Sequence, residues 1–270
     1  MGGRFSVMGV VNVTPDSFSD GGQWLDPAAA IAHGRELAAE GAVILDVGGE
    51  STRPGAEPVG EAEELRRVIP VIEGLAAAGG AAISVDTTKA AVARAALAAG
   101  ASYVNDVSAL RADPELAAVV AEGGCDCCLM HMQGSPRTMQ EHPHYDDVVG
   151  EVAAFLEERV AFALAEGIAA EHIQVDPGIG FGKTLAHNLE LLRRLDEIVA
   201  LGFPVVFGVS RKSFLGRITG REVASERVAA TVAANVLAYE RGAAVFRVHD
   251  VAPTVDALRV ASATLRGDDA

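Results

Sequence analysis

The sequence predicts one α/β domain over residues 1–270, folded as a (β/α)8 TIM barrel with long first and second βα loops. Eight short apolar runs each precede a turn and a helical stretch with apolar residues at three- and four-residue spacing. The runs are nearly continuous in Val, Ile, Leu, Phe and Ala, which is typical of parallel strands buried on both faces. Strict alternation leaves an open doubly wound sheet or a closed barrel. Eight units in 270 residues match the usual size of the barrel, which we therefore favour.

The elements follow these runs in chain order. The predicted strands are Ser6–Asn12, Ala42–Val47, Ala81–Val85, Ser102–Asn105, Cys127–His131, His172–Asp176, Pro204–Val209 and Ala244–Val248. The predicted helices are Pro27–Glu40, Glu61–Ala78, Lys89–Ala99, Pro114–Glu122, Val148–Glu166, Ala186–Ala200, Ser225–Arg241 and Val251–Leu265. Asp26-Pro27 and Asp113-Pro114 each place a capping side chain before a proline at the first helical position. Glycine follows several helices, at positions 41, 100, 167 and 242.

Composition narrows the class of protein. The formal net charge is −15, and a field of that sign repels nucleic acid and anionic membranes, so neither is an expected partner. No apolar run approaches the roughly 20 residues of a membrane helix, and the first residues read as a buried strand and not as a signal peptide. The three cysteines, Cys125, Cys127 and Cys128, are odd in number and clustered, which indicates reduced thiols in the cytoplasm.

Polar residues recur at the carboxyl end of every predicted strand. In a barrel these ends meet at one mouth, where such enzymes keep their active sites. A single acid after a strand is often a helix cap, but a polar set after all eight strands indicates a site. The set comprises Asn12, Asp46 with GGESTRPGA, Asp86-Thr87, Asn105-Asp106, His131, Asp176-Pro177-Gly178, Ser210-Arg211-Lys212-Ser213 and Arg247-Val248-His249-Asp250.

Two kinds of strand-end residue predict the ligand. Asp86, Asn105 and Asp176 are acceptors suited to the paired N–H donors of an aminopyrimidinone edge. Arg53, Lys212 and Arg247, with His249 nearby, gather cations in an acidic chain and so favour a phosphate-bearing ligand. We expect a hydrogen-bonding heterocycle at one end of the ligand and an anion at the other. The long, glycine-bearing loops 13–25 and 48–59 are expected to act as lids.

Eight segments in order, MGVVNVTPDSFSDGG, DVGGESTRPGA, SVDTTK, VNDVS, LMHMQGSP, DPGIGFGKT, GVSRKSFLG and RVHDV, make the chain resemble the dihydropteroate synthase family over nearly its whole length. The resemblance implies a pterin-binding barrel that condenses 6-hydroxymethyl-7,8-dihydropterin pyrophosphate with p-aminobenzoate in folate biosynthesis. It further implies a Mg²⁺ requirement, release of pyrophosphate by a dissociative route, and a homodimer. Loss of pyrophosphate before attack is chemically reasonable, because cations stabilise the leaving group and the aromatic amine needs only positioning.

The resemblance also implies roles for individual residues. Its pterin contacts fall on Asp86, Asn105, Asp176 and Lys212. Its pyrophosphate contacts fall on Thr52, Arg53, Arg247 and His249, and its metal contact on Asn12. Asp20 matches an acid of the first loop that steadies the metal and the developing cation. The p-aminobenzoate site matches Thr52, Pro54, Phe181, Lys212 and Ser213. Asp20, Lys212 and Arg247 are the catalytic candidates.

Several residues allow a second interpretation. His131 is as compatible with a packed, hydrogen-bonded role as with catalysis, and Asp46 with support of a ligand-binding neighbour. Cys127 and Cys128 lack a second pair at zinc spacing and are interpreted as buried packing. Lys183 lacks the full spacing of a phosphate-binding loop. A pterin-dependent methyltransferase of the same barrel class would share the acceptor pocket without the cationic rim, and a silent pterin-binding protein would be expected to lose Asn12, Asp20 or Lys212.

Overall fold

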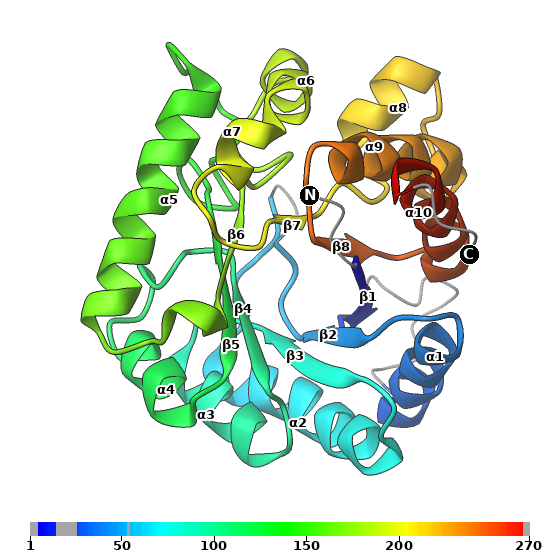
Figure 1. Cartoon of the computed structure of the whole chain (residues 1–270). Coiled ribbons are helices and arrows are strands. Elements are labelled where there is room, and N and C mark those ends of the chain that lie inside the picture. Colours follow the sequence, from blue (N-terminus) through cyan, green and yellow to red (C-terminus); the bar gives the residue numbers. More distant parts are fainter. Residues whose placement is uncertain (1–4, 15–25, 53–54, 267–270) are drawn as a thin grey trace.

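The structure, a computed structural model, describes residues 5–14, 26–52 and 55–266. All of its strands are parallel and belong to one eight-stranded sheet in the order β6-β5-β4-β3-β2-β1-β8-β7. A parallel bridge between Val175 and Val205 joins the two ends of that order. The sheet therefore closes into a barrel with helices outside it (Figure 1), which confirms the predicted (β/α)8 fold.

The predicted strands differ from those observed by one or two residues at most ends. The strands are β1 Ser6–Asn12, β2 Ile44–Gly48, β3 Ala82–Asp86, β4 Tyr103–Asp106, β5 Asp126–Met130, β6 Ile173–Asp176, β7 Val206–Phe207 and β8 Val245–Val248. β7 is much shorter than predicted, because the chain from Gly208 to Lys212 turns away from the sheet to form part of the mouth. Buried side chains dominate every strand, as expected for a sheet covered on both faces.

The helices depart from the prediction in more places. They are α1 Pro27–Ala39, α2 Glu61–Ala78, α3 Ala90–Ala98, α4 Leu116–Gly123, α5 Val148–Ala165, α6 Leu185–Arg193, α7 Leu195–Val199, α8 Ser213–Thr219, α9 Val228–Glu240 and α10 Val251–Arg266, with 3-10 turns Ala170–His172 and Ala224–Arg227. Asp26 caps α1 as predicted. Asp113 Oδ1 accepts a hydrogen bond from the Glu115 amide at 3.0 Å, the type of bond predicted, but its Oδ2 accepts one from the first amide of α3, and α4 begins at Leu116, two residues later than expected.

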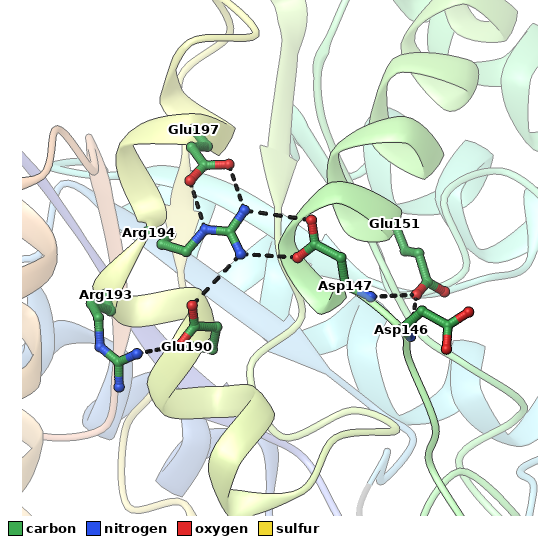
Figure 2. A network of polar contacts seen from close by, with 7 residues as sticks. All are labelled: Asp146, Asp147, Glu151, Glu190, Arg193, Arg194 and Glu197. Atoms are coloured by element: carbon green, nitrogen blue, oxygen red, sulfur yellow. Dashed lines mark hydrogen bonds and ion pairs between the residues drawn. The ribbon is translucent and has the colours of Figure 1, made fainter.

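One predicted helix, Ala186–Ala200, is divided into α6 and α7 at Arg194. Figure 2 shows the contacts at this break: the guanidinium of Arg194 lies between Asp147 at the start of α5 and Glu197 in α7. Glu190 in α6 lies 3.6 Å from the same guanidinium and also pairs with Arg193. This network joins α5, α6 and α7, and α6 directly follows the loop that forms one side of the mouth.

The core has two main parts. The larger cluster fills the space between the strands and the surrounding helices, whereas a small cluster within the barrel contains Met8, Tyr103, Cys128, Val206 and Val245. Cys127 belongs to the outer cluster and Cys128 to the inner one, and all three cysteines are buried free thiols, which confirms their interpretation as packing residues. In the described ranges, no helix is both long and apolar enough to cross a bilayer.

Strand register brings the polar residues to one level. Gly48 of β2 pairs with Asp86 of β3, and Asp86 pairs with Asn105 of β4. Asp176 ends β6 opposite Met130 of β5. Because all strands run the same way, these ends form one rim, as predicted from their positions in the sequence.

Candidate active site

Asp46 lies at the centre of the polar network in the barrel. Its side chain is fully buried and accepts hydrogen bonds from Ser84 Oγ at 2.6 Å and from Asn105 Nδ2 at 3.0 Å. It also accepts one from Arg247 Nε at 2.7 Å. A second donor of Arg247, Nη2, lies 2.8 Å from Asp86 Oδ2. Arg247 thus bridges two carboxylates, and Asp46 orients both Asn105 and Arg247.

Asp86 is held in an environment that disfavours its charge. Burial raises the pKa of Asp86 to about 7, and the opposing attraction of Arg247 only partly offsets that rise. Arg247 contacts one carboxylate oxygen, Oδ2, and Asp86 also lines a cavity of about 310 Å³. The group can therefore present an acceptor to a ligand, and binding of N–H donors would favour its charged form.

Asp176, at the end of β6, forms a second acceptor at the barrel mouth. Its Oδ1 accepts a hydrogen bond from the Gly178 amide at 2.6 Å. Burial raises the pKa of Asp176, while the nearby positive charge of Lys212 opposes the shift. Gly208 lies beside it: a Cβ atom at position 208 would stand 3.6 Å from Asp176 Oδ2 and 3.9 Å from Arg247 Cβ. The absence of a side chain at Gly208 keeps the approach to both residues open.

Lys212 lies at the turn before α8 and reaches across to the loop that follows β6. Its ammonium donates to the carbonyl of Ile179 and stands 4.5 Å from the centre of the Phe181 ring. Burial lowers the pKa of Lys212 to about 8, and Asp176 partly opposes that change. Ser213, the first residue of α8, is exposed beside it. The structure thus brings Lys212, Phe181 and Asp176 together.

His249 and the residues around it are joined by side-chain contacts. The amide and Nδ1 of His249 lie 3.1 and 3.0 Å from Ser210 Oγ. Arg211 donates through Nε and Nη2 to the two oxygens of Asp250, at 2.9 and 2.5 Å. Arg211, whose φ of 59° is unusual for a residue with a side chain, therefore joins the loop after β7 to the loop after β8. This pairing explains why only Lys212 of the Arg211-Lys212 pair faces Phe181.

The remaining predicted residues lie around the mouth or outside the described ranges. Thr52 lines the cavity with Asp86, and Asn12 ends β1 beside Gly48. The other lining residues that matter here are Thr87, Ser108 and Met132, so this cavity occupies the β2–β5 side of the mouth. Asp20, Arg53 and Pro54 lie outside the described residues, as do residues 15–25 of the first predicted lid.

Sequence reasoning misses part of this network. It does not single out Ser84, although that residue precedes Asp86 by two positions and so points to the same side of its strand. The sequence allows Asp46 to support a ligand-binding neighbour, and its contacts with Asn105 and Arg247 agree with that role. By sequence, the segment around Lys183 is compared only with a phosphate-binding loop of nucleotide-binding proteins, whereas in the structure Lys183 Nζ lies 2.9 Å from His131 Nδ1. None of these pairings follows a recognisable sequence spacing, since each joins different strands or loops.

Comparison with known proteins places this geometry in one family. Residues 8–249 match the family described as pterin binding enzyme. The dihydropteroate synthase of Escherichia coli strain K12 is 49% identical over 259 residues, covering 96% of this chain and 91% of that protein. The solved structure of the Xanthomonas albilineans dihydropteroate synthase with 4-aminobenzoic acid has a TM-score of 0.92 and 54% identity, covering 98% of this chain and 94% of that one. The same enzyme in complex with 7,8-dihydropteroate has a TM-score of 0.88 and 51% identity, with 98% and 95% covered.

A barrel with acceptors and cations at the carboxyl ends of its strands is, by fold and family match, a pterin-binding enzyme. Within that class, the chain belongs to the dihydropteroate synthases, transferases of folate synthesis, as its identity to them over nearly the whole length shows. The resemblance stated from the sequence motifs is therefore confirmed.

Proposed function

We propose that the protein condenses 6-hydroxymethyl-7,8-dihydropterin pyrophosphate with p-aminobenzoate to give 7,8-dihydropteroate and pyrophosphate, with Mg²⁺ required. The observation that carries this proposal is the Asp46–Arg247–Asp86 network, because it places two acceptor groups and a guanidinium at one point of the mouth. The binding of 4-aminobenzoic acid and of 7,8-dihydropteroate by the similar Xanthomonas albilineans enzyme supports both ends of the reaction.

The pterin would bind among the acceptors. Asp86, Asn105 and Asp176 would accept the N–H groups of its ring edge, and Lys212 would donate to a ring acceptor. Two features support this assignment: Asn105 donates to Asp46, which orients its amide, and Gly208 places no side chain beside Asp176 and Arg247. A pterin that supplies donors to these buried carboxylates replaces the water they lose, so binding favours their charged forms.

The pyrophosphate and the aryl amine would lie toward the rim. The pyrophosphate would be bound by Thr52, Arg53, Arg247 and His249. The two arginines suit this role, because a guanidinium can donate two parallel hydrogen bonds to phosphate oxygens. Thr52, Pro54, Phe181, Lys212 and Ser213 would form the p-aminobenzoate site. The contact between the Lys212 ammonium and the Phe181 ring supports a site in which an aromatic wall and a cation stand side by side.

The residues fit a metal that arrives with the substrate. Among the described residues, no group of three or more His, Cys, Asp or Glu side chains is placed to hold a metal ion. Asn12 offers one amide oxygen at the end of β1, and Mg²⁺ commonly takes one or two protein ligands together with substrate phosphates and water. Asn12 would hold the ion, with Asp20 steadying it, and the ion would supply neutralisation of the departing pyrophosphate.

The chain's own residues would favour a dissociative reaction. Arg247 and His249 would stabilise the negative charge that grows on the leaving pyrophosphate, while the acceptors Asp86 and Asp176 hold the pterin as positive charge develops on it. Asp20 would steady that cation from the first loop. The amine of p-aminobenzoate is a weak nucleophile, and Lys212 and Phe181 would act chiefly by positioning it in line.

The proposal includes a cytoplasmic homodimer. Buried reduced thiols agree with a reducing compartment, and a net charge of −15 disfavours nucleic acid and anionic membranes as partners. The homodimer is the assembly that the family resemblance implies. Sedimentation equilibrium tests the assembly: a monomer across the micromolar range would refute it.

The function is tested by measuring pyrophosphate release with each substrate and Mg²⁺ omitted in turn. Release that requires all three, together with dihydropteroate in equal amount, is expected. Release that continues without p-aminobenzoate would indicate hydrolysis, and full activity in EDTA would refute the metal requirement. Lys212→Met should lose activity while retaining its fold by circular dichroism, because that substitution keeps the apolar stem and removes only the ammonium.

A further inference from the structure

The chain contains three lysines and nineteen arginines, and all three lysines lie at the barrel mouth. Lys212 contacts Ile179 and Phe181, and Lys89 pairs with Glu50 and Glu64. Lys183 is the third, and the proposed reaction assigns it no role. A lysine presents a compact ammonium, whereas an arginine presents a broad, planar guanidinium.

Lys183 ends the loop that carries Phe181 from β6 to α6. Side-chain donors hold four successive carbonyls of this loop. The pairs are Lys212 with Ile179 O, Gln140 with Gly180 O at 2.7 Å, Lys183 with Phe181 O at 3.0 Å, and Tyr145 with Gly182 O at 2.9 Å. Donors from the segments after β5 and β7 thus hold three of these carbonyls. The fourth, that of Phe181, accepts from Lys183, which belongs to the loop itself.

The ammonium of Lys183 is itself held in an unusual place. Lys183 is only 3% exposed, and its Nζ lies 2.9 Å from His131 Nδ1 as well as 3.0 Å from the Phe181 carbonyl. The His131 ring packs edge-on against Phe155 at 4.9 Å. Burial lowers the pKa of His131 to about 3, so the ring is neutral at physiological pH and can accept through Nδ1. Burial lowers the pKa of Lys183 to about 7, and the negative charge of Asp176 opposes that shift.

We propose that Lys183, which is hydrogen-bonded to His131, is a positioning residue that fixes Phe181 as the wall of the p-aminobenzoate pocket. The inference rests on the proposed function, because it takes Phe181 to form that wall. Lys183 acts through the Phe181 carbonyl and touches neither substrate. Phe181 is then held with its ring against the Lys212 ammonium. Two lysines therefore position this part of the amine pocket: Lys183 through the carbonyl of Phe181 and Lys212 through its ring.

The geometry separates the two substrates. Asp176, which would bind the pterin, has a hydrogen bond from Gly178 and the charge of Lys212 nearby, and neither depends on Lys183, although the charge of Lys183 also acts to lower the pKa of Asp176. Phe181 has no such second support at its carbonyl among the described contacts, where Lys183 is the donor. Loss of Lys183 should therefore weaken p-aminobenzoate while leaving the pterin contacts in place.

Steady-state kinetics of Lys183→Met tests the proposal on the full chain. The expected result is a KM for p-aminobenzoate raised about tenfold or more, the size of one lost charge-assisted hydrogen bond, with the KM for the pterin pyrophosphate within about threefold of wild type. Arg241→Met is the matched control, since Arg241 also donates to main-chain carbonyls, at Arg193 and Leu237, but far from the mouth. Equal rises in both KM values, or no rise in either, would overturn the proposal.

Two variants of His131 test the same contact without changing Lys183, in case Lys183→Met fails to fold. His131→Asn keeps an acceptor near the position of Nδ1, whereas His131→Leu removes it. The p-aminobenzoate KM should stay near wild type in the first variant and rise in the second, and identical values would overturn the role of His131. If the wild-type enzyme forms no dihydropteroate at all, the proposed function fails instead, which keeps the two outcomes distinct.

Nuclear magnetic resonance gives a readout that a purely structural lysine would not change. With three lysines in the chain, a sample labelled at the lysine ε-carbon gives three signals, and Lys183→Met assigns one of them. Addition of p-aminobenzoate with Mg²⁺ and pyrophosphate should shift the Lys183 signal, because the bound ring would lie against Phe181, whose carbonyl accepts a hydrogen bond from Lys183. A Lys183 signal that stays in place while the Lys212 signal moves would contradict the positioning role.

Discussion

Asp86→Asn should stabilise the folded protein at alkaline pH while removing pterin binding. The pKa of Asp86 is raised by burial from 3.8 to about 7 in the folded protein, so between these values the folded state is protonated and the unfolded state is ionised. The folded state therefore binds more protons, and stability falls as pH rises from about 4 to about 7. Asparagine is neutral throughout and escapes this loss.

The size of the effect follows from the shift. A rise of about three pKa units corresponds to about 4 kcal/mol above pH 7, at 1.36 kcal/mol per unit. Near pH 4.5 most of the cost is absent, because protonated aspartic acid and asparagine are both neutral in the fold. The difference in the free energy of unfolding between variant and wild type should thus increase by about 3 kcal/mol between pH 4.5 and 8.5.

Urea unfolding followed by far-ultraviolet circular dichroism measures this difference at several pH values. The slope against urea should be the same for both proteins, so that the midpoint alone reports stability. Calorimetry with a pterin analogue should show that the more stable variant no longer binds. A difference that stays flat or falls as pH rises would refute the account of a buried, disfavoured carboxylate at Asp86.

Three further substitutions test the rest of the mouth. Gly178→Ala should lower stability by more than about 3 kcal/mol, since φ is 67° and the new Cβ would lie 1.8 Å from the His131 carbonyl oxygen; an unchanged melting temperature would contradict this. Arg247→Met should lower the free energy of unfolding by about 3–5 kcal/mol, because it removes the positive charge that bridges the buried carboxylates of Asp46 and Asp86, and calorimetry should show a greater loss for pyrophosphate than for bare pterin. Equal losses for both ligands would mean that the arginine is only structural. Asp176→Ala should abolish binding of a pterin that lacks pyrophosphate, at a cost of about 2–5 kcal/mol, and an unchanged affinity would remove Asp176 from the site.

The barrel could be predicted from the sequence because its strands are buried on both faces. Runs such as Ser6–Asn12 contain few polar residues, so their ends are sharp and their number is clear. The errors lie where local signals compete. Asp113 carries a capping side chain, but tertiary structure directs one of its oxygens to α3, and α8, with seven residues, is too short to show a clear period.

The membership of the site could be predicted, but not its internal pairing. Strand ends of a barrel must meet, so Asp86, Asn105 and Asp176 can be grouped from their positions in the sequence alone. The sequence predicts acceptors at one end of the ligand and cations at the other. The structure adds that Arg247 contacts Asp46 and Asp86, because β8 closes the barrel beside β1 and the long side chain of Arg247 reaches across the interior. Such contacts depend on tilt and register, which no single segment of sequence contains.

The central claim is that one site at the mouth binds both substrates and joins them. The most direct test is a single-turnover reaction of the wild-type enzyme with Mg²⁺, labelled dihydropterin pyrophosphate and p-aminobenzoate, with products separated by chromatography. The account predicts dihydropteroate and pyrophosphate in equal amounts, and loss of both in Lys212→Met. Pyrophosphate formed without dihydropteroate, or dihydropteroate formed at the wild-type rate by Lys212→Met, would contradict it.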